Sequence, residues 1–146
     1  MMLRPRRVCL ALAILTAGAE RGSAQTADST AGKSVLAGAY TAAQARAGET
    51  VFTRVCAQCH VPVQFNDANF ERAWVGRTAR DLFELIRTQM PQDNPGGLRR
   101  DEYAAVLAYI FQLNGYPAGD SALATGDAAL RRVRIERRPG SPPRPR

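Results

Sequence analysis

Apolar side chains recur with helical spacing near the C-terminal end of the chain. In residues 100–114 they stand three or four positions apart and so share one face of a helix: Tyr103, Val106, Leu107, Ile110 and Leu113. Asn114 and Gly115 predict where this helix ends, and Pro117 prevents it from resuming. The pattern predicts one strong amphipathic helix.

A second helix is predicted nearer the N-terminus. Thr41 and Gln44 fit a capping box, in which the threonine caps the helix and the glutamine side chain reaches back to the capping residue. The helix is expected to run to about Cys56. Gly48 in its interior costs about 1 kcal/mol relative to alanine. A glycine at this position is tolerable if another helix crosses closely there.

The remaining pattern predicts one short helix and two loops. Leucine, phenylalanine and isoleucine side chains predict a helix over residues 79–88, with Thr78 as its N-cap and Asp81 in its first turn. Residues 61–76 have no clean period and are expected to form a loop with short turns. Residues 90–97, rich in proline and glycine, predict a rigid turn-rich loop. No alternating strand pattern of useful length is present, so the predicted fold class is all-α.

One motif carries chemistry: Cys56-Ala57-Gln58-Cys59-His60. Two thiols three positions apart on a helical turn lie close to one face, so each can add to one vinyl group of a haem and form a thioether. The adjacent imidazole can then bind the iron. A bare Cys-x-x-Cys is also found in redox dithiols and in halves of zinc sites. The histidine directly after the second cysteine favours covalent haem c.

The rest of the composition narrows this site. His60 is the only histidine among 146 residues, and Cys9 is the only thiol outside the motif. A zinc site needs four protein ligands, and Cys9 lies in a segment expected to be removed. A haem with two histidine ligands from one chain is excluded. The second axial ligand is therefore of another kind, or absent.

Residues 1–24 are predicted to be a secretory signal peptide. Three arginines precede the apolar run Val8–Ala19, and small residues lead to a cleavage site before Gln25. The run is about a dozen residues, shorter than the ~20 that a membrane-spanning helix needs. An uncleaved anchor is the alternative. Export agrees with haem c, which is attached outside the cytoplasm, so we expect a periplasmic protein with no transmembrane segment after cleavage.

The mature chain is long enough for one small domain. We expect a flexible leader over residues 25–38, one folded domain that carries the Cys56–His60 motif over residues 39–130, and an extended basic tail, rich in Pro and Arg, over residues 131–146. The net charge of +7 is concentrated outside the domain. Residues 25–129 hold nine basic and eleven acidic side chains, whereas residues 130–146 hold seven arginines and one glutamate.

This distribution of charge bears on partners. A nucleic-acid-binding protein needs basic residues spread over a folded recognition surface, and the predicted domain lacks them, so nucleic acid is excluded. The Arg-rich tail is a candidate for electrostatic docking to an acidic partner or an anionic membrane surface. The alternative is a solvated tail without a specific partner.

From about Ala37 to Gly119 the chain resembles class I cytochromes c, the small monohaem electron carriers. The resemblance rests on Gly48, Phe52, the Cys56–His60 motif, Trp74, Met90-Pro91 and the helix that contains Tyr103 and Tyr109. It implies a small cytochrome c fold, with about three to four helices wrapped around one covalently bound haem. It also implies that the first and last helices cross near Gly48, Phe52 and Tyr109.

The resemblance implies a set of site residues as well: Cys56 and Cys59 as haem tethers, His60 as proximal iron ligand, Met90 as distal iron ligand and Trp74 as a haem contact. Met90 lies outside the predicted helices in a polar loop, where a core-filling role is less expected. The segment after His60 departs from the mitochondrial-type pattern, so the carbonyl that holds the proximal imidazole is not assignable, although Pro62 is a candidate.

The predicted function is one-electron transfer by an exported monohaem cytochrome, and not catalysis. The expected donor is a periplasmic dehydrogenase, and the expected acceptor is an oxidase or another cytochrome. One alternative is a permanent cytochrome subunit of a periplasmic dehydrogenase complex. Another is a haem gas sensor in which Met90 dissociates. A zinc-binding or redox-dithiol module is the least expected of these alternatives.

Overall fold

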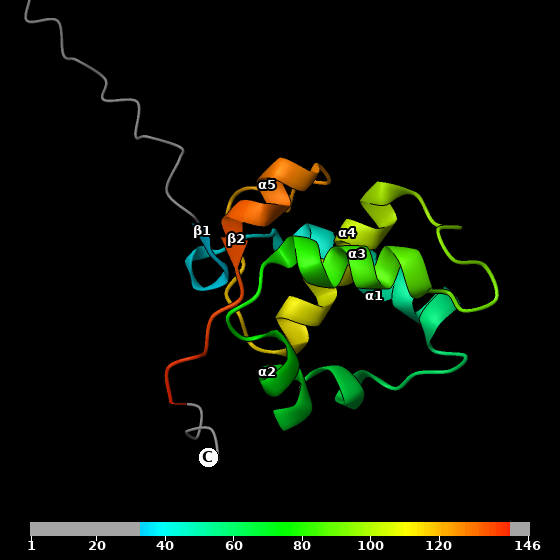
Figure 1. Ribbon diagram of the computed structural model, residues 1–146, viewed down its shortest axis with the longest axis horizontal. Helices are drawn as coiled ribbons and strands as arrows, with labels where there is room; N and C mark the ends of the chain where they lie inside the picture. The colour runs from blue at the N-terminus through cyan, green and yellow to red at the C-terminus, as the bar shows by residue number, and fades with distance from the viewer. Residues whose placement is uncertain (1–32, 141–146) are drawn as a thin grey trace, which may run out of the picture.

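Two crossing helices, α1 (Ala42–Val51) and α4 (Arg100–Leu113), form the centre of the fold (Figure 1). The computed structural model describes residues 33–140. Around this pair lie three shorter helices: α2 (Ala68–Trp74), α3 (Ala79–Gln89) and α5 (Asp127–Arg132). This mostly helical architecture confirms the predicted all-α class, with five α-helices within these residues where three to four were expected.

The two central helices approach each other closely at Gly48. A Cβ atom added there would lie 1.8 Å from the carbonyl oxygen of Ala105. One turn further on, Phe52 packs against Tyr109 of α4, with ring centroids 5.4 Å apart. The expected crossing near these three residues is confirmed. Only a residue without a side chain allows the backbones to approach this far.

Helix α4 is buried more completely than its sequence pattern indicates. Every residue from Tyr103 to Phe111 is buried, including those outside the predicted apolar face. Among the buried residues are the small side chains of Ala104, Ala105 and Ala108, and Ala105 lies at the close approach to Gly48. A helix that is apolar all round is a central helix, and α4 is therefore the core of the domain.

The predicted caps are confirmed in part. The Thr41 hydroxyl accepts a bond from the backbone N–H of Gln44 at 3.1 Å. The Gln44 side chain, however, does not reach back: it donates to the carbonyl of Leu123 at 2.9 Å and accepts from the N–H of Leu123 at 2.7 Å. These two bonds tie α1 to the segment before α5. Thr78 is the N-cap of α3 as expected, and its reciprocal bonding with Asp81 adds a capping box that was not predicted from the sequence.

The prediction of a loop over residues 61–76 is wrong. This stretch contains a 3₁₀ turn, Pro62–Phe65, and helix α2. The Asp67 carboxylate caps α2 by accepting bonds from the N–H groups of Asn69 and Phe70 at 2.8 and 3.0 Å. Only Phe70 of this helix is buried, so the sequence shows no apolar period. The feature of the sequence that could have indicated this helix was Asp67 as its N-cap.

The flexible leader and the extended tail are also corrected by the structure. Residues 33–38 are not a flexible leader, because β1 (Lys33–Ser34) pairs in parallel with β2 (Val133–Arg134) and Val35 is fully buried. Residues 131–140 are not an extended tail, because they include the end of α5, strand β2 and the fully buried Ile135. The predicted signal peptide, Cys9 and residues 141–146 lie outside the described residues.

Backbone hydrogen bonds hold the C-terminal segment in place. The carbonyl of Ile135 accepts from the N–H of Gly76 at 2.8 Å, and its N–H donates to the carbonyl of Arg77 at 2.9 Å. The Tyr116 hydroxyl donates to the carbonyl of Glu136 at 2.7 Å. Val133 and Ile135 are buried while the residue between them is exposed. This alternation was hidden in the sequence by the surrounding arginines.

None of the helices within residues 33–140 combines the length and the apolar character needed to cross a membrane.

We predict that Gly48→Ala destabilises the fold by about 3 kcal/mol, because the new methyl group collides with the backbone of α4 and forces the helices apart. Chemical denaturation followed by circular dichroism measures the loss. Gly126→Ala is the matched control, since a Cβ there meets no atom within 4 Å. Similar losses in the two variants would contradict a close crossing.

We also predict a loss of stability above pH 10 through Tyr116. Burial, and secondarily the charge of Glu71, raises the pKa of Tyr116 to about 12. The folded state therefore retains the phenolic proton between pH 10 and 12, where the unfolded chain releases it. Stability present below pH 10 is lost across this window, by up to about 2.7 kcal/mol. Urea unfolding measured at intervals from pH 9 to 12 should show a smaller loss for Tyr116→Phe, and equal slopes would contradict the prediction.

Candidate functional site

The Cys-x-x-Cys-His motif forms the turn that ends the first helix. Helix α1 continues into a π-helical turn, Phe52–Cys56, which is closed by the bond from Ala57 N–H to the Phe52 carbonyl at 2.8 Å. The carbonyl of Cys56 then accepts from the N–H groups of Cys59 and His60, at 3.1 and 2.9 Å. The local hydrogen bonds therefore draw the three motif side chains onto one turn.

Both thiols of the motif are free. Cys56 is half-buried and Cys59 is exposed. Burial raises the pKa of the Cys56 thiol, whereas a reactive dithiol depends on a lowered thiol pKa. Within residues 33–140 no three His, Cys, Asp or Glu side chains are grouped as metal ligands are. The arrangement therefore fits neither a redox dithiol nor a zinc centre well.

The imidazole of His60 is held by two residues of the turn that follows it. Its Nδ1 lies 3.3 Å from Oε1 of Gln64, and its ring packs edge-on against Phe65 at 5.4 Å between centroids. Phe65 in turn packs edge-on against Phe52 at 5.6 Å. The residue beside Nδ1 is thus Gln64, and not Pro62, which was the candidate from the sequence. Sequence reasoning missed Gln64 because its contact depends on the 3₁₀ turn.

Met90 lies at the C-terminal end of α3, at the start of the proline- and glycine-rich loop. Its N–H donates to the carbonyl of Ile86 at 2.9 Å, and its own carbonyl accepts from the hydroxyl of Tyr103 at 2.8 Å. Tyr103 belongs to α4 and is 1% exposed. The buried tyrosine therefore fixes the backbone of Met90 relative to the central helix.

The elements that carry the motif and Met90 lie on the same side of the molecule. In Figure 1 the π-helical turn with the chain that follows it, and the end of α3 with the loop after it, both lie at the right-hand side. Different residues hold the two candidate ligands: Gln64 and Phe65 contact His60, whereas Tyr103 holds the backbone of Met90.

Trp74 ends helix α2 and is half-buried against the core. The guanidinium of Arg77 lies 5.3 Å from its ring centroid. Five other apolar side chains are also only partly covered by the core: Leu36, Val55, Phe65, Met90 and Leu98. Val61 and Val63, which follow the motif directly, are 54% and 64% exposed.

The partly covered apolar side chains bear on whether a haem fits here, because Val55 lies in the π-helical turn and Phe65 packs against His60. A flat, largely apolar group tethered at the Cys motif would cover side chains that otherwise face water. The donor set also fits, since two free thiols, one imidazole and one thioether are the groups that haem c uses in electron carriers. The residues present are therefore compatible with a covalent haem.

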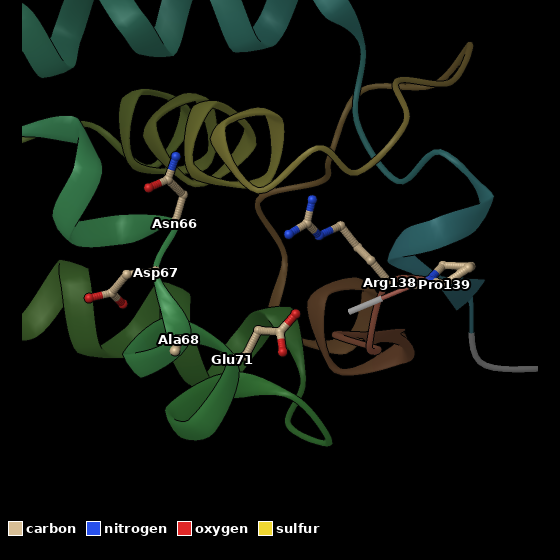
Figure 2. Close-up of a pocket in the computed structure, with 7 residues that line it drawn as sticks. Asn66, Asp67, Ala68, Glu71, Arg138 and Pro139 are labelled. Carbon is tan, nitrogen blue, oxygen red and sulfur yellow. The ribbon is translucent and has the colours of Figure 1, made fainter. Parts of the chain in front are cut away.

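A separate pocket of about 340 Å³ lies between the start of α2 and the C-terminal segment (Figure 2). Asn66, Asp67, Ala68 and Glu71 line one side, and Arg138, Pro139 and Gly140 line the other. Glu71 also pairs with Arg137 at 2.8 Å. No predicted site residue contributes to this pocket.

Residues 43–110 match a family model described as cytochrome c oxidase, cbb3-type, subunit III. The match spans just under half of the chain and includes the Cys56–His60 motif and Met90. No curated protein and no solved structure matches the chain. Residues 43–110 are therefore a c-type cytochrome domain, the kind of domain that carries haem and transfers electrons.

We predict that Tyr103→Phe lowers the free energy of unfolding by about 1–3 kcal/mol. The substitution leaves the carbonyl of Met90 without its buried donor, and the N–H of Leu98 also loses its acceptor. Guanidinium denaturation of the purified protein measures the change. Tyr109→Phe retains the ring that packs on Phe52 and should cost less. A Tyr103→Phe protein as stable as the parent would contradict the role of this bond.

Proposed function

We propose, from the premise that residues 43–110 are a c-type cytochrome domain, that this chain is an exported monohaem cytochrome carrying one electron at a time. The observation that carries the proposal is the motif turn, which follows directly from α1 and carries two free thiols and one imidazole. The signal-like sequence of residues 1–24 supports export to a periplasm.

Each predicted site residue has one role in this proposal. The thiols of Cys56 and Cys59 each add across a vinyl group: a carbon–sulfur bond forms and the thiol hydrogen passes to the other vinyl carbon. His60 supplies the proximal nitrogen ligand and Met90 the distal sulfur ligand. A haem c bound here supplies one-electron redox chemistry at its iron. Trp74, whose ring is half-buried, would contact the haem.

The pair of axial ligands favours a carrier over an enzyme. If His60 and Met90 both held the iron of a bound haem, no iron position would be left for a substrate or for oxygen. The same two side chains serve both oxidation states, so little rearrangement accompanies electron transfer. Tyr103 and Gln64 support this by holding the Met90 backbone and the His60 ring in place before any partner binds.

Its partners are redox proteins. We propose a periplasmic dehydrogenase as donor and an oxidase or another cytochrome as acceptor, with electrons passing at the surface beside the motif, where Val61 and Val63 are exposed. Electrostatic docking through the basic tail is less strongly supported by the structure than by the sequence. Arg134 donates a hydrogen bond to the carbonyl of Gly76, and Arg137 forms an ion pair with Glu71. The proposal of electrostatic docking is therefore kept for residues 141–146.

A second candidate is a permanent cytochrome subunit of a larger oxidoreductase. The description of the matched family, which names an oxidase subunit, favours it. Size-exclusion chromatography of a periplasmic extract, with detection at a haem absorbance band, separates the two. A small monomer supports the free carrier, whereas co-elution with a large enzyme supports the subunit. A gas sensor is tested in the same sample, since rapid CO binding to the ferrous protein would show that Met90 dissociates.

We predict that the matured protein shows a covalent c-type haem spectrum with a ferric sulfur-to-iron charge-transfer band. Met90→Ala should keep the haem and lose this band, because the only methionine of residues 33–140 is removed. Leu98→Ala, in the same loop and also half-buried, is the control and should keep the band. Absorption spectra of the oxidised parent, Met90→Ala and Leu98→Ala proteins show which of them keep the band. A band that persists in Met90→Ala would remove this residue from the ligand set.

A further inference from the structure

We propose that Gln64 is a positioning residue for His60, which fixes the proton of the imidazole on Nδ1 and leaves Nε2 free to bind iron. The inference rests on the proposed function and deepens it, since it says how this chain prepares its proximal ligand. It starts from the geometry of one amide group.

The orientation of the Gln64 amide is set by a backbone group. The N–H of Val61 lies 3.0 Å from the amide atom assigned as Oε1. A backbone N–H can only donate, and an amide NH₂ can also only donate. If the amide were turned over, two donors would face each other. The atom beside Val61 is therefore the oxygen, whichever way the two similar atoms are first assigned.

The same oxygen determines the tautomer of His60. It lies 3.3 Å from Nδ1, and an amide oxygen accepts but never donates. The hydrogen of this contact must therefore be carried by Nδ1. A neutral imidazole has only one N–H, so Nε2 retains its lone pair. This is the nitrogen that remains available as an iron ligand.

The support behind Gln64 is anchored to the core. Gln64 belongs to the 3₁₀ turn Pro62–Phe65, and its N–H donates to the carbonyl of Val61 at 3.0 Å. At the end of the turn, the carbonyl of Phe65 accepts from the side chain of Asn114 at 2.6 Å. Asn114 follows α4 and is the only buried polar residue within residues 33–140. The turn thus connects the imidazole with the C-terminal end of the central helix.

An acceptor on Nδ1 affects the metal as well as the ring. It increases the basicity of the ligating nitrogen, and this favours the ferric over the ferrous state. A thioether on the opposite side has the reverse effect and raises the reduction potential. Gln64, as a neutral acceptor, gives an intermediate ligand strength. A carboxylate there would lower the potential further, and an apolar side chain would raise it.

The test compares four holoproteins: the parent, Gln64→Leu, Gln64→Glu and Gln58→Leu. Gln58 is the matched control, because it is an exposed glutamine within the motif whose amide is directed to the carbonyl of Arg54. Gln64→Glu keeps an oxygen acceptor for both Val61 and His60. Because the chain has a single histidine, nitrogen-15 NMR of the ferrous protein reports on His60 alone.

We expect the Nδ1–H proton to be visible and slow to exchange with water in the parent, in Gln64→Glu and in Gln58→Leu. In Gln64→Leu its exchange should be about tenfold faster or more. At a fixed potential the ferric-to-ferrous ratio should fall about tenfold in Gln64→Leu, about 59 mV for one electron. It should rise in Gln64→Glu and stay unchanged in Gln58→Leu.

Two results would overturn the proposal while leaving the proposed function intact. One is a Gln64→Leu protein with the parent's exchange rate and potential. The other is a Gln58→Leu protein that shifts as much as Gln64→Leu. If the parent itself carries no covalent haem, the proposed function fails first, and the role of Gln64 fails with it. Retention of the parent's properties by Gln64→Glu, apart from the lower potential, separates a hydrogen-bonding role from a folding role.

Discussion

The close approach of α1 to α4 at Gly48 is the constraint on which the rest of the structure depends. The absence of a Cβ lets one backbone lie against the Ala105 carbonyl of the other. Two further elements, α3 and the 3₁₀ turn Pro62–Phe65, contact α4 directly, while α2 packs on that turn and α5 packs on α3. Burial of α4 from Tyr103 to Phe111 removes a large apolar area from water, and helices as short as α2 and α5 owe their stability to such packing more than to their own propensity.

The same crossing also positions the candidate site. Because Phe52 packs on Tyr109, the π-helical turn that carries Cys56 begins from a fixed place on the core. Aromatic contacts then continue outward through Phe65 to the ring of His60. Tyr103, one and a half turns earlier on α4, holds the Met90 backbone. One central helix therefore supports both candidate axial ligands through different side chains, so its position controls the geometry between them.

Charge plays a smaller part than the composition indicates. The net charge of +7 and its concentration near the C-terminus predict an extended basic tail. Part of that predicted tail instead completes the fold. Val133 and Ile135 enter the core, and Arg137 pairs with Glu71. On the other side of the domain, Arg80 and Arg100 both pair with Asp127 and join α3 and α4 to α5. These partly exposed pairs contribute modestly to stability, but they help to set the position of the short helix.

The sequence by itself determined the chemistry of the motif, the all-α class, and the three helices that carry caps or strong apolar periods. Those features are local: a Cys-x-x-Cys-His spacing, an N-cap at Thr78 and a glycine before an aromatic residue each act within a few positions. Only the tertiary structure decided what Gln44, Gln64 and the segment after Arg131 do. Gln44 bonds to Leu123, 79 positions away, and β1 pairs with a strand a hundred residues later. The partner of a hydrogen-bonding side chain, and the face that a short strand buries, depend on which distant backbone lies beside it, and that is decided when the helices pack.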